Sequence, residues 1–403
     1  MEWKLKDLTV DGKGSYGIGA PAVPYQEDKL TYLRITDIND DGSLNFSDLK
    51  SVDAEDAEKY ILKENDIVFA RTGNSTGRSY FYEKQHGTFV YAGFLIKFSL
   101  DPNKVNPRIL KYYTHSKPYF DWVNSFDTGA TRGNINAKTY GDMEIELPSR
   151  KVQDKIVSIL SSLDRKIELN NKINADLEEM AQAIFKNWFV DFEPFKDGKF
   201  VDSELGMIPE GWKVGRLGEF CKCLLGGTPS RSKEEYWNGE VNWINSGEIN
   251  KFRILEASEK ITELGLAKSA TKLLPKKTTV LAITGATLGQ VSLLEIDTCA
   301  NQSVIGVLEN TEVPYEYIYP FIKDRIEMLI QHQTGGAQQH INKDNVESLI
   351  FLLPAINVLE DYISLVSPMY KRIESQCFEN LYLSTLRDTL LPRLMSGELE
   401  VPE

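Results

Sequence analysis

The sequence predicts an α+β fold made of two similar domains in tandem, each followed by a long helix. Three observations indicate this fold. The second half of the chain repeats landmarks of the first in the same order, short β-rich runs fill the front of each half, and each half ends in a long stretch of helical periodicity. The two helices are expected to pair as an antiparallel coiled coil, which would give the chain pseudo-twofold symmetry.

The internal repeat is visible at five places, and the offset between the copies stays between 206 and 212 residues. Chance similarity would not keep the same order and spacing over so many landmarks, so a tandem duplication is predicted. The matching segments are Trp3–Leu8 with Trp212–Leu217, Leu33–Asn39 with Ile244–Asn250, Asp66–Gly73 with Thr278–Gly285, Ile135–Asn136 with Ile341–Asn342, and Leu147–Pro148 with Leu353–Pro354.

The front of each half reads as β-structure interrupted by glycine-bearing turns. Runs such as Asp66–Ala70, Thr88–Phe98 and Thr279–Ile283 are short and rich in β-branched and aromatic residues. They predict two α+β domains over residues 1–148 and 208–353. The polar stretch Phe195–Leu205 is expected to form the core of a linker over residues 193–207.

Each domain is followed by about 37 residues with helical spacing, a length of about 55 Å. These segments define helical spacers at residues 149–192 and 354–403, the latter including the C-terminal segment. Pro368 predicts a kink or a late start of the second helix. Two helices packed separately on their own domains remain the alternative to a paired stalk. The apolar positions are 152, 156, 159, 163, 167, 177, 181, 184 and 188 in the first helix, and Leu359, Ile363, Val366, Tyr370, Ile373, Cys377, Leu390 and Leu391 in the second.

Three asparagines fall on or beside these apolar stripes. Asn170 and Asn174 lie along the first helix and Asn380 along the second. Asparagines buried in a coiled-coil seam can fix its register at some cost in stability. A solvated helix face accounts for them equally well.

Composition and charge narrow the class of protein. Hydrophobic residues make up 41% and charged residues 26% of the 403 residues, which is typical of a soluble globular protein. No uncharged apolar run approaches the roughly 18 residues of a membrane span, no signal peptide opens the chain, and the four cysteines fit a reducing compartment. We therefore expect a cytoplasmic protein that does not associate with a membrane. The net charge of −13 argues against a chain that coats nucleic acid unaided, so any affinity must come from a local surface or a basic partner.

Motifs that could indicate catalysis fail on inspection. Gly12–Gly17 fits GxGxxG, but Pro21 and Pro24 follow where a nucleotide-binding site needs a helix. Cys221 and Cys223 lack a second ligand pair at zinc spacing and are expected to serve packing or surface roles. His340 stands where the first copy has Asn134, so it is expected to be a hydrogen-bonding or surface residue. We predict no catalytic residue, metal site or cofactor in this chain.

Two loops recur in both copies, one at Arg71–Arg78 and Ile283–Gln290 and the other at Thr128–Asn134 and Thr334–His340. Thr72-Gly73…Gly77 and Thr284-Gly285…Gly289 share a frame that implies a turn with glycine-only torsion angles, whereas the residues between them differ in chemistry. Arginine pairs with guanine and amide side chains pair with adenine, so these loops suit contacts with DNA bases and phosphates. Ordinary solvent-exposed turns are the alternative. The candidate DNA-contacting residues are Arg71, Thr72, Asn74, Ser75, Thr76, Arg78, Arg132 and Asn134 in the first domain, and Thr228, Ser230, Arg231, Lys233, Thr284, Thr287, Gln290, Gln338, Gln339 and His340 in the second.

The expected geometry favours DNA. Two similar readers on an antiparallel helix pair would be held at a fixed spacing, and DNA presents the same face every ~34 Å. A helix pair of about 55 Å spans that distance. Because the two readers differ, the site they read would be asymmetric and divided by an unread spacer.

Four segments resemble the DNA-specificity subunit of type I restriction–modification systems. They are Ala183–Phe192 at the end of the first helix, Ile208–Trp212 at the start of the second half, Gly226–Ser230, and Leu386–Gly397 near the C-terminus. The resemblance covers nearly the whole chain, although Met1-Glu2-Trp3 departs from the Pro-Glu-Gly-Trp that opens the second half in this pattern.

The resemblance implies two target-recognition domains separated by helical spacers in a non-catalytic subunit that reads a bipartite double-stranded DNA site. It further implies two methyltransferase (modification) subunits that methylate adenine at N6, and motor-nuclease (restriction) subunits. S-adenosylmethionine, ATP and Mg²⁺ are expected in those partners. Two alternatives remain: an acidic coiled-coil adaptor that does not itself read DNA, and an autonomous endonuclease.

Overall fold

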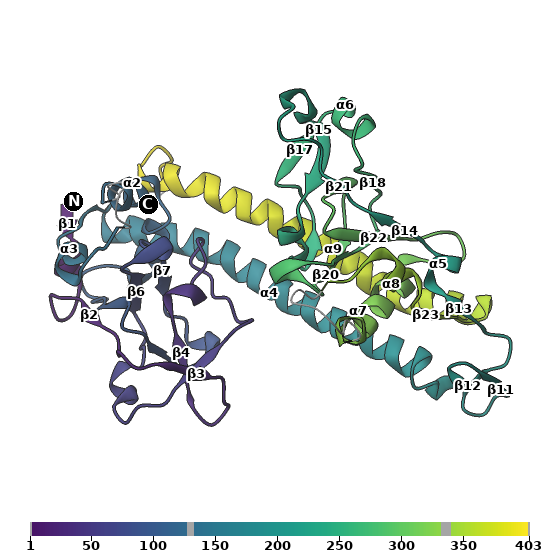
Figure 1. Cartoon of the computed structure of the whole chain (residues 1–403). Coiled ribbons are helices and arrows are strands. Elements are labelled where there is room, and N and C mark those ends of the chain that lie inside the picture. The colour runs from purple at the N-terminus through teal and green to yellow at the C-terminus, as the bar shows by residue number, and fades with distance from the viewer. Residues whose placement is uncertain (1, 127–132, 332–339, 402–403) are drawn as a thin grey trace. The chain divides into compact units, whose positions relative to one another are not determined.

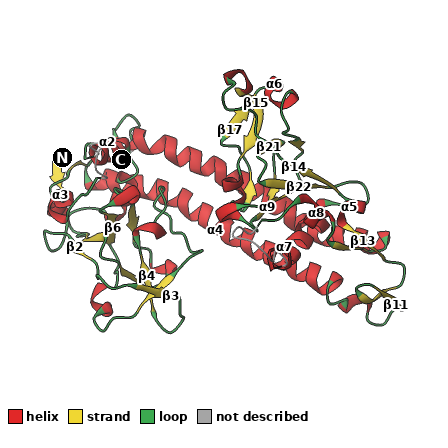
Figure 2. Cartoon of the chain, in the orientation of Figure 1, coloured by secondary structure: helices red, strands yellow, loops and turns green. Residues whose placement is uncertain are grey.

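The computed structural model describes residues 2–126, 133–331 and 340–401. The chain divides into two compact units, the first formed by Met1–Lys166 with Leu383–Glu403 and the second by Ile167–Tyr382. Each unit combines β-sheets with a segment of each of the two long helices, α4 (Arg150–Phe189) and α9 (Ile356–Met395) (Figures 1 and 2).

The first unit contains two four-stranded sheets and one pair of short strands. The sheets have the orders β2-β9-β6-β7 and β3-β5-β4-β8, and β1 pairs with β10. The strands are β1 (Glu2–Lys4), β2 (Ser15–Tyr16), β3 (Ala22–Pro24), β4 (Leu30–Leu33), β5 (Lys50–Val52), β6 (Asp66–Ala70), β7 (Ser79–Phe81), β8 (Phe89–Tyr91), β9 (Leu95–Ser99) and β10 (Glu144–Glu146). The short helices are α1 (Pro107–Tyr113), α2 (Lys117–Asn124) and α3 (Ala137–Gly141).

The second unit repeats this plan. Its sheets have the orders β14-β22-β19-β20-β16 and β17-β15-β21-β18, β13 pairs with β23, and β11 pairs with β12. The strands are β11 (Phe200–Ser203), β12 (Gly206–Pro209), β13 (Lys213–Arg216), β14 (Lys222–Leu225), β15 (Trp237–Ile244), β16 (Arg253–Ile254), β17 (Glu259–Ile261), β18 (Leu273–Leu274), β19 (Thr279–Ala282), β20 (Val291–Leu294), β21 (Thr298–Ala300), β22 (Val304–Leu308) and β23 (Ile350–Leu353). The shorter helices are α5 (Leu217–Phe220), α6 (Glu263–Ala267), α7 (Tyr315–Gln331) and α8 (Lys343–Glu347).

The repeat predicted from the sequence is confirmed at the level of strand pairing. The parallel pair β4–β8 aligns Leu33 with Tyr91, and the parallel pair β15–β21 aligns Ile244 with Ala300 at the equivalent place. The predicted strands over Asp66–Ala70 and Thr279–Ile283 are present as β6 and β19. The single predicted run over Thr88–Phe98 is wrong, because a turn after Tyr91 divides it into β8 and β9. The expected linker contains the β11–β12 hairpin.

A close backbone approach also recurs in both units. A Cβ atom on Gly17 would lie 2.2 Å from the Ala92 carbonyl oxygen, and a Cβ atom on Gly226 would lie 2.1 Å from that of Asn301. The glycine–carbonyl pairs are related by the same offset as the repeated sequence. Gly17 belongs to the rejected GxGxxG segment, which runs through strand β2 rather than into a helix.

Replacing Gly17 with alanine should therefore destabilise the first unit by about 2 kcal/mol, because the new methyl group meets backbone that cannot turn away. Gly19→Ala is a matched control, since a Cβ atom there would meet nothing within 4 Å. Urea denaturation of both variants measures the difference. Equal stability of the two variants would contradict the role given to Gly17.

The two long helices each contain 40 residues. Helix α9 begins at Ile356 and continues through Pro368 and Pro392, so the late start, one of the two outcomes predicted from Pro368, is wrong. Packing of its apolar face outweighs the one backbone hydrogen bond that an internal proline removes. No helix among the described residues has the length and apolar character needed to cross a bilayer.

The buried face of α4 differs from the predicted one. Positions 156 and 181 are buried as predicted, but the burial pattern is otherwise displaced by one residue over much of the helix. The buried residues are Gln153, Ile156, Val157, Leu160, Asp164, Asn170, Asn174, Glu178, Ala181, Phe185 and Phe189. The α9 stripe is closer to the prediction, with Leu359, Val366, Tyr370, Ile373, Cys377 and Leu391 buried.

Each unit has an apolar core to which both long helices contribute. In the first unit, Ile156 and Leu160 of α4 and Leu391 and Leu394 of α9 belong to one cluster. In the second unit, Phe185 of α4 and Tyr362 of α9 belong to another, with ring centroids 6.5 Å apart.

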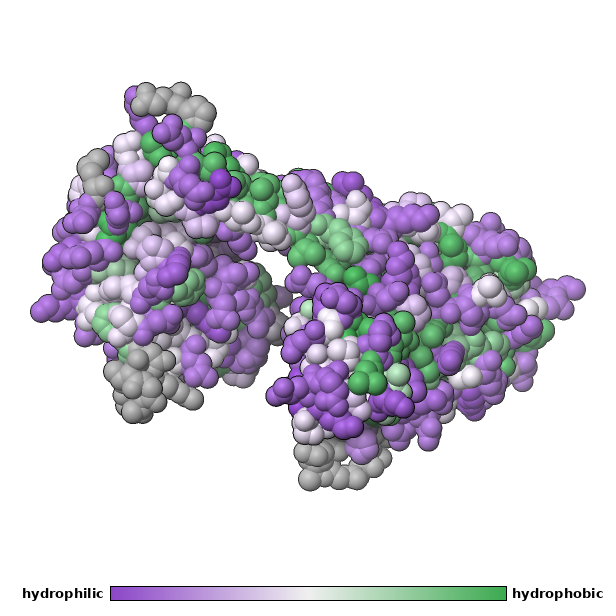
Figure 3. Space-filling model, turned by 90° about the horizontal axis from the view of Figure 1, so that it is seen from above, coloured by the Kyte–Doolittle hydropathy of each residue, from purple (hydrophilic) through white to green (hydrophobic). Residues whose placement is uncertain are grey.

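The face in Figure 3 shows mainly hydrophilic residues, with hydrophobic residues in small groups between them.

The asparagines of the helices are part of the second unit's interior. The Asn170 side-chain amide donates hydrogen bonds to Asn380 Oδ1 and to a Glu379 carboxylate oxygen, both at 2.8 Å, and Gln376 donates to Asn170 Oδ1 at 3.0 Å. Asn170 and Asn174 are almost fully buried. A solvated helix face is therefore the wrong account of these two residues.

Candidate nucleic-acid interface

The first recurring loop leaves the end of β6 and is closed at its base by backbone hydrogen bonds. The Ala70 amide donates to the Arg78 carbonyl at 2.8 Å, and the Gly77 amide donates to the Ala70 carbonyl at 3.1 Å. Gly73 and Gly77 have φ angles of 73° and 89°, in the left-handed region that favours glycine. The loop therefore has a defined shape, on which Asn74 is exposed and Ser75 is buried.

The second loop, at the end of β19, has the same construction. The Ala282 amide donates to the Gln290 carbonyl and the Gly289 amide to the Ala282 carbonyl, both at 2.9 Å. Gly285 and Gly289 have φ angles of 72° and 85°. The predicted glycine turn frame is confirmed in both domains. Gln290 is exposed on this loop, and Thr284 and Thr287 are half-buried.

In each domain the structure joins the first recurring loop to the described residues at the end of the other recurring loop. The Ile135 amide donates to the Arg71 carbonyl at 3.0 Å, and the Ile341 amide donates to the Ile283 carbonyl at 3.0 Å. In the first domain, Thr72 also forms an antiparallel bridge with Asn134. The hydroxyl of Thr76 donates to the carbonyls of Gly73 and Gly133, at 2.8 and 2.9 Å. His340 is exposed beside the second contact, while Arg132, Gln338 and Gln339 lie outside the described residues.

The two arginines of the first loop have different surroundings. Arg78 Nε donates to an Asp40 carboxylate oxygen at 2.6 Å, and one of its terminal nitrogens donates to the Ile38 carbonyl at 3.0 Å. The guanidinium of Arg71 lies over the ring of Tyr16, 5.1 Å from its centroid. Arg78 thus joins the loop to another part of the domain, and Arg71 has an aromatic rather than an acidic neighbour.

The remaining candidates of the second domain lie along the segment after β14. The hydroxyl of Thr228 donates to Gln302, and the next residue, Ser303, accepts from the Ile283 amide at 2.9 Å, which links Thr228 to the recurring loop. The Ser230 hydroxyl lies 2.9 Å from that of Ser232.

Both basic side chains of that segment have partners. Arg231 forms an ion pair with Glu259 and lies over the ring of Trp237 at 3.7 Å from its centroid. The Lys233 ammonium donates to the Tyr236 hydroxyl at 3.0 Å. The pKa of Arg231 is raised by its hydrogen bond to Glu259, so the pair stays ionised at neutral pH.

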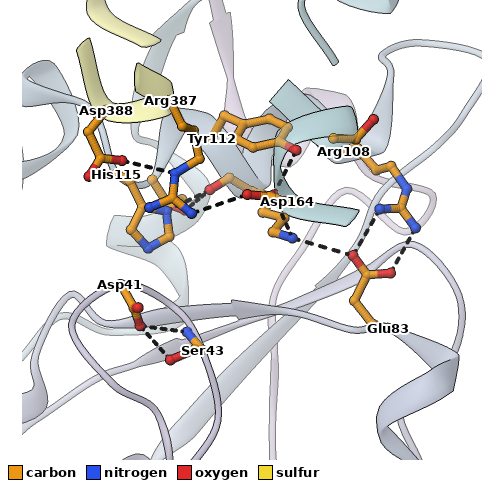
Figure 4. A network of polar contacts seen from close by, with 12 residues as sticks. Asp41, Ser43, Glu83, Arg108, Tyr112, His115, Asp164, Arg387 and Asp388 are labelled. Carbon is orange, nitrogen blue, oxygen red and sulfur yellow. Dashed lines mark hydrogen bonds and ion pairs between the residues drawn. The ribbon is translucent and has the colours of Figure 1, made fainter. Parts of the chain in front are cut away.

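A network of ion pairs around the buried carboxylates of Asp164 and Glu83 joins the first domain to the helices (Figure 4). Asp164 of α4 accepts a hydrogen bond from the Tyr112 hydroxyl at 2.9 Å and pairs with Lys111 and with Arg387 of α9, each at 3.1 Å. Burial alone would raise the pKa of the Asp164 carboxyl, but the two cations outweigh burial and lower it. Beside them, Arg108 grips Glu83 through two hydrogen bonds of 2.9 and 2.7 Å.

An equivalent network holds the second domain. Glu178 of α4 pairs with Arg253 at 2.7 Å and with Lys323 at 2.9 Å, and the Arg253 side chain is only 1% exposed. Sequence reasoning missed both networks, because a carboxylate on a long helix normally lies on a solvated face. Acidic residues at buried helical spacing were the only available signal.

The cysteines of the second domain lie in its apolar core. Cys221 and Cys223 belong to the core cluster, and burial raises the pKa of both thiols to about 12. At neutral pH both are therefore protonated and pack as small apolar side chains. Within the described ranges, no group of three or more histidine, cysteine or acidic side chains could hold a metal ion.

Comparison with known proteins adds a family to this geometry. The family model for the type I restriction modification DNA specificity domain matches residues 16–179 and 209–376. The type I restriction enzyme MjaIX specificity subunit of Methanocaldococcus jannaschii is 29% identical over 73% of this chain and 69% of its own length. The HindI specificity subunit of Haemophilus influenzae is 24% identical over 85% of this chain and 88% of its own length.

A solved structure shows the same fold. The type I restriction–modification S subunit from M. genitalium aligns with a TM-score of 0.58 at 15% identity, over 100% of this chain and 96% of that one. The family model matches both halves of the duplicated chain. The protein accordingly belongs to the type I restriction–modification specificity subunits, which are non-catalytic and recognise DNA through two target-recognition domains in tandem.

Proposed function

We propose that this chain reads an asymmetric, bipartite double-stranded DNA site, with one half read by each target-recognition domain. The two domains present the same loop frame with different side chains, and this observation carries the proposal. Arg71 and Arg78 of the first loop correspond to Ile283 and Gln290 of the second, and Asn134 corresponds to His340. Loops with the same backbone shape would be placed on DNA in the same way, and their different side chains would contact different bases.

The two long helices act in this proposal as a spacer, paired as an antiparallel coiled coil with pseudo-twofold symmetry. The contacts within each unit support the pairing. Asp164 meets Arg387 in the first unit, and Asn170 meets Asn380 in the second, so partner numbers fall along α9 as they rise along α4. Forty residues of helix span about 60 Å, enough for one ~34 Å turn of DNA.

Buried polar contacts would fix the register of this pair. A slip by one residue would separate Asn170 from its partners on α9 and leave its amide buried without hydrogen bonds. The spacing between the two half-sites would then follow from the register of the helices.

The same helices are proposed to dock the partner subunits. Along 151–190 and 357–395, the side chains of Leu169, Met180 and Tyr382 are at least half exposed despite their apolar character. Such side chains on an otherwise polar face suit contact with helices of a partner. We expect two methyltransferase subunits and, where present, motor-nuclease subunits. S-adenosylmethionine, ATP and Mg²⁺ would bind in those partners and not in this chain.

Single-molecule mapping of N6-methyladenine tests the proposed function. In cells that contain the modification subunits, methylation should occur at one divided, asymmetric motif and disappear when this chain is deleted. Gln290→Ala should relax only the half-site read by the second domain. An unchanged methylation pattern after deletion would show that another protein selects the site. Partner complexes that assemble on this chain but bind all duplexes alike would instead favour an adaptor that does not read DNA.

A further inference from the structure

Two exposed aromatic residues, Phe94 and Tyr16, contact Arg71 in the first domain. Phe94, in the turn between β8 and β9, is 58% exposed, and Tyr16, the last residue of β2, is 43% exposed. The Arg71 amide donates to the Phe94 carbonyl at 3.1 Å, and the Arg71 guanidinium lies over the Tyr16 ring. Two large aromatic side chains are therefore exposed on residues that contact Arg71, at the loop proposed to meet DNA.

Backbone hydrogen bonds fix the turn and the strand end that carry the two rings. The Leu95 amide donates to the Ala92 carbonyl at 2.8 Å, which closes the turn that carries Phe94. The Gly17 amide, next to Tyr16, donates to the Leu95 carbonyl at 3.1 Å. The Ala137 amide donates to the Tyr16 hydroxyl at 3.1 Å. The backbone that carries both rings is therefore already ordered, so binding a ligand would cost no ordering of the turn.

Of the candidate arginines that the structure describes, Arg71 is also the one most available to a ligand. Among the described residues no carboxylate pairs with it, whereas Arg78 pairs with Asp40 and Arg231 pairs with Glu259. Its Nε is buried without a hydrogen-bond partner, and the guanidinium lies over the Tyr16 ring. The planar donor group of an arginine suits the two adjacent acceptors that guanine presents in the major groove.

The second domain lacks this cluster. The amide of Ile283 donates to the carbonyl of Ser303, as that of Arg71 does to Phe94, so Ser303 stands where Phe94 stands in the first domain. The first strand of that sheet, β14, ends in Leu225, as β2 ends in Tyr16. A cluster confined to one of two matched domains is not needed for the fold, and this points to recognition.

We propose that Tyr16, Arg71 and Phe94 form one base-reading cluster. Arg71 reads a guanine, and Phe94 packs against the 5-methyl group of a neighbouring thymine. The half-site of the first domain then contains a guanine next to a thymine. This inference rests on the proposed function and adds two specificity-determining residues to it. The chemistry is that of apolar readout, in which a phenyl ring recognises the one base that carries a methyl group in the major groove.

The test replaces single thymines of the mapped first half-site with deoxyuridine, which lacks only the methyl group. Binding is measured with the complex of this chain and its modification subunits at fixed salt. One replacement, next to a guanine, should weaken wild-type binding by about fourfold, the loss expected for one buried methyl group. Phe94→Ala should weaken binding to the thymine duplex and remove the sensitivity to uracil. Phe94→Leu, which keeps an apolar surface, should retain part of it.

Phe46→Ala is the matched control, because Phe46 is 49% exposed in the same unit and packs edge-on to His86. It should bind both duplexes as the wild type does, and thermal melting should show all variants folded. If no deoxyuridine affects wild-type binding, or if Phe94→Ala keeps the wild-type sensitivity, the cluster does not read thymine, although a bipartite motif still supports the proposed function. A complex with no sequence preference at all would overturn the proposed function itself.

Discussion

Replacing Glu178 with alanine should destabilise the second unit by about 3–5 kcal/mol, because the change leaves a buried guanidinium with only the more distant Glu295 carboxylate, at 3.8 Å. Arg253 is almost completely buried and pairs with Glu178 at 2.7 Å. Lys323 would lose the same partner. Denaturation in urea, followed by tryptophan fluorescence, measures the loss.

Glu179→Ala is the matched control, since Glu179 is the exposed neighbour on the same helix and its removal should change stability by less than about 0.5 kcal/mol. A double variant that also replaces Arg253 with an apolar residue should recover part of the loss, because the buried guanidinium is then absent and only the half-buried Lys323 has lost its partner. Equal stabilities of Glu178→Ala and Glu179→Ala would contradict the importance of the pair.

The same pair makes stability depend on pH in a known direction. Burial alone would raise the pKa of the Glu178 carboxyl, but Arg253 and Lys323 outweigh it and hold the pKa below its ordinary value of 4.5. A carboxyl with a lowered pKa in the folded state stabilises the fold at every pH above the unfolded value. This contribution is lost as the pH falls from about 4.5 through the folded pKa, and Glu178→Ala should lack that part of the acid sensitivity.

Replacing Arg71 with alanine should relax recognition at one base pair of the first half-site and weaken specific binding by about 1–3 kcal/mol, or roughly 5-fold to 150-fold. The guanidinium has no acidic partner among the described residues, so its removal leaves no buried carboxylate behind. Binding of the assembled complex to duplexes with single base-pair changes measures the relaxed position.

Arg71→Lys distinguishes base reading from phosphate contact. Lysine keeps the positive charge but lacks the planar fork, so it should preserve salt-dependent binding and lose discrimination at the same base pair. If Arg71→Lys binds with wild-type selectivity, Arg71 contacts the phosphate backbone. If Arg71→Ala changes neither affinity nor selectivity, Arg71 does not contact DNA.

Much of the fold could be predicted because the same sequence pattern occurs twice in the chain. The offset between the copies predicted which residues are equivalent, and strand pairing confirmed this at Leu33 and Ile244. The turn glycines, such as Gly73 and Gly285, were predictable because only glycine adopts their torsion angles without strain. Local chemistry and repetition were sufficient for these features.

The polar interior of the helices could not be predicted in the same way. Asn170 and Glu178 occupy buried positions of α4, where periodicity assigns apolar residues. Their burial is stable because Gln376 and Arg253, distant in the sequence, supply hydrogen bonds and charge. A helical pattern shows spacing along one helix and not the partners across from it, so the predicted stripe on α4 was displaced.

The candidate site likewise has features that the sequence predicted and features that it did not. The loops and their pairing followed from the repeat, but the partners of Arg78 and Arg231 lie 38 and 28 residues away, in segments without any pairing signal. Phe94 was missed because it lies within the β-rich run Thr88–Phe98, which predicted one continuous strand. An aromatic residue directly after Gly93 was the available signal for an exposed turn.

The division of the chain between the two units has a consequence for biosynthesis. The first core includes Leu391 and Leu394, whereas every residue of the second unit lies between Ile167 and Tyr382. During translation, all residues of the second unit are therefore synthesised before the first unit is complete. Until the C-terminal residues of α9 are added, part of the interior of the first unit stays exposed to solvent. A nonsense mutation between Tyr382 and Leu391 would remove both core leucines, leave that interior uncovered and expose the truncated product to chaperones and proteases.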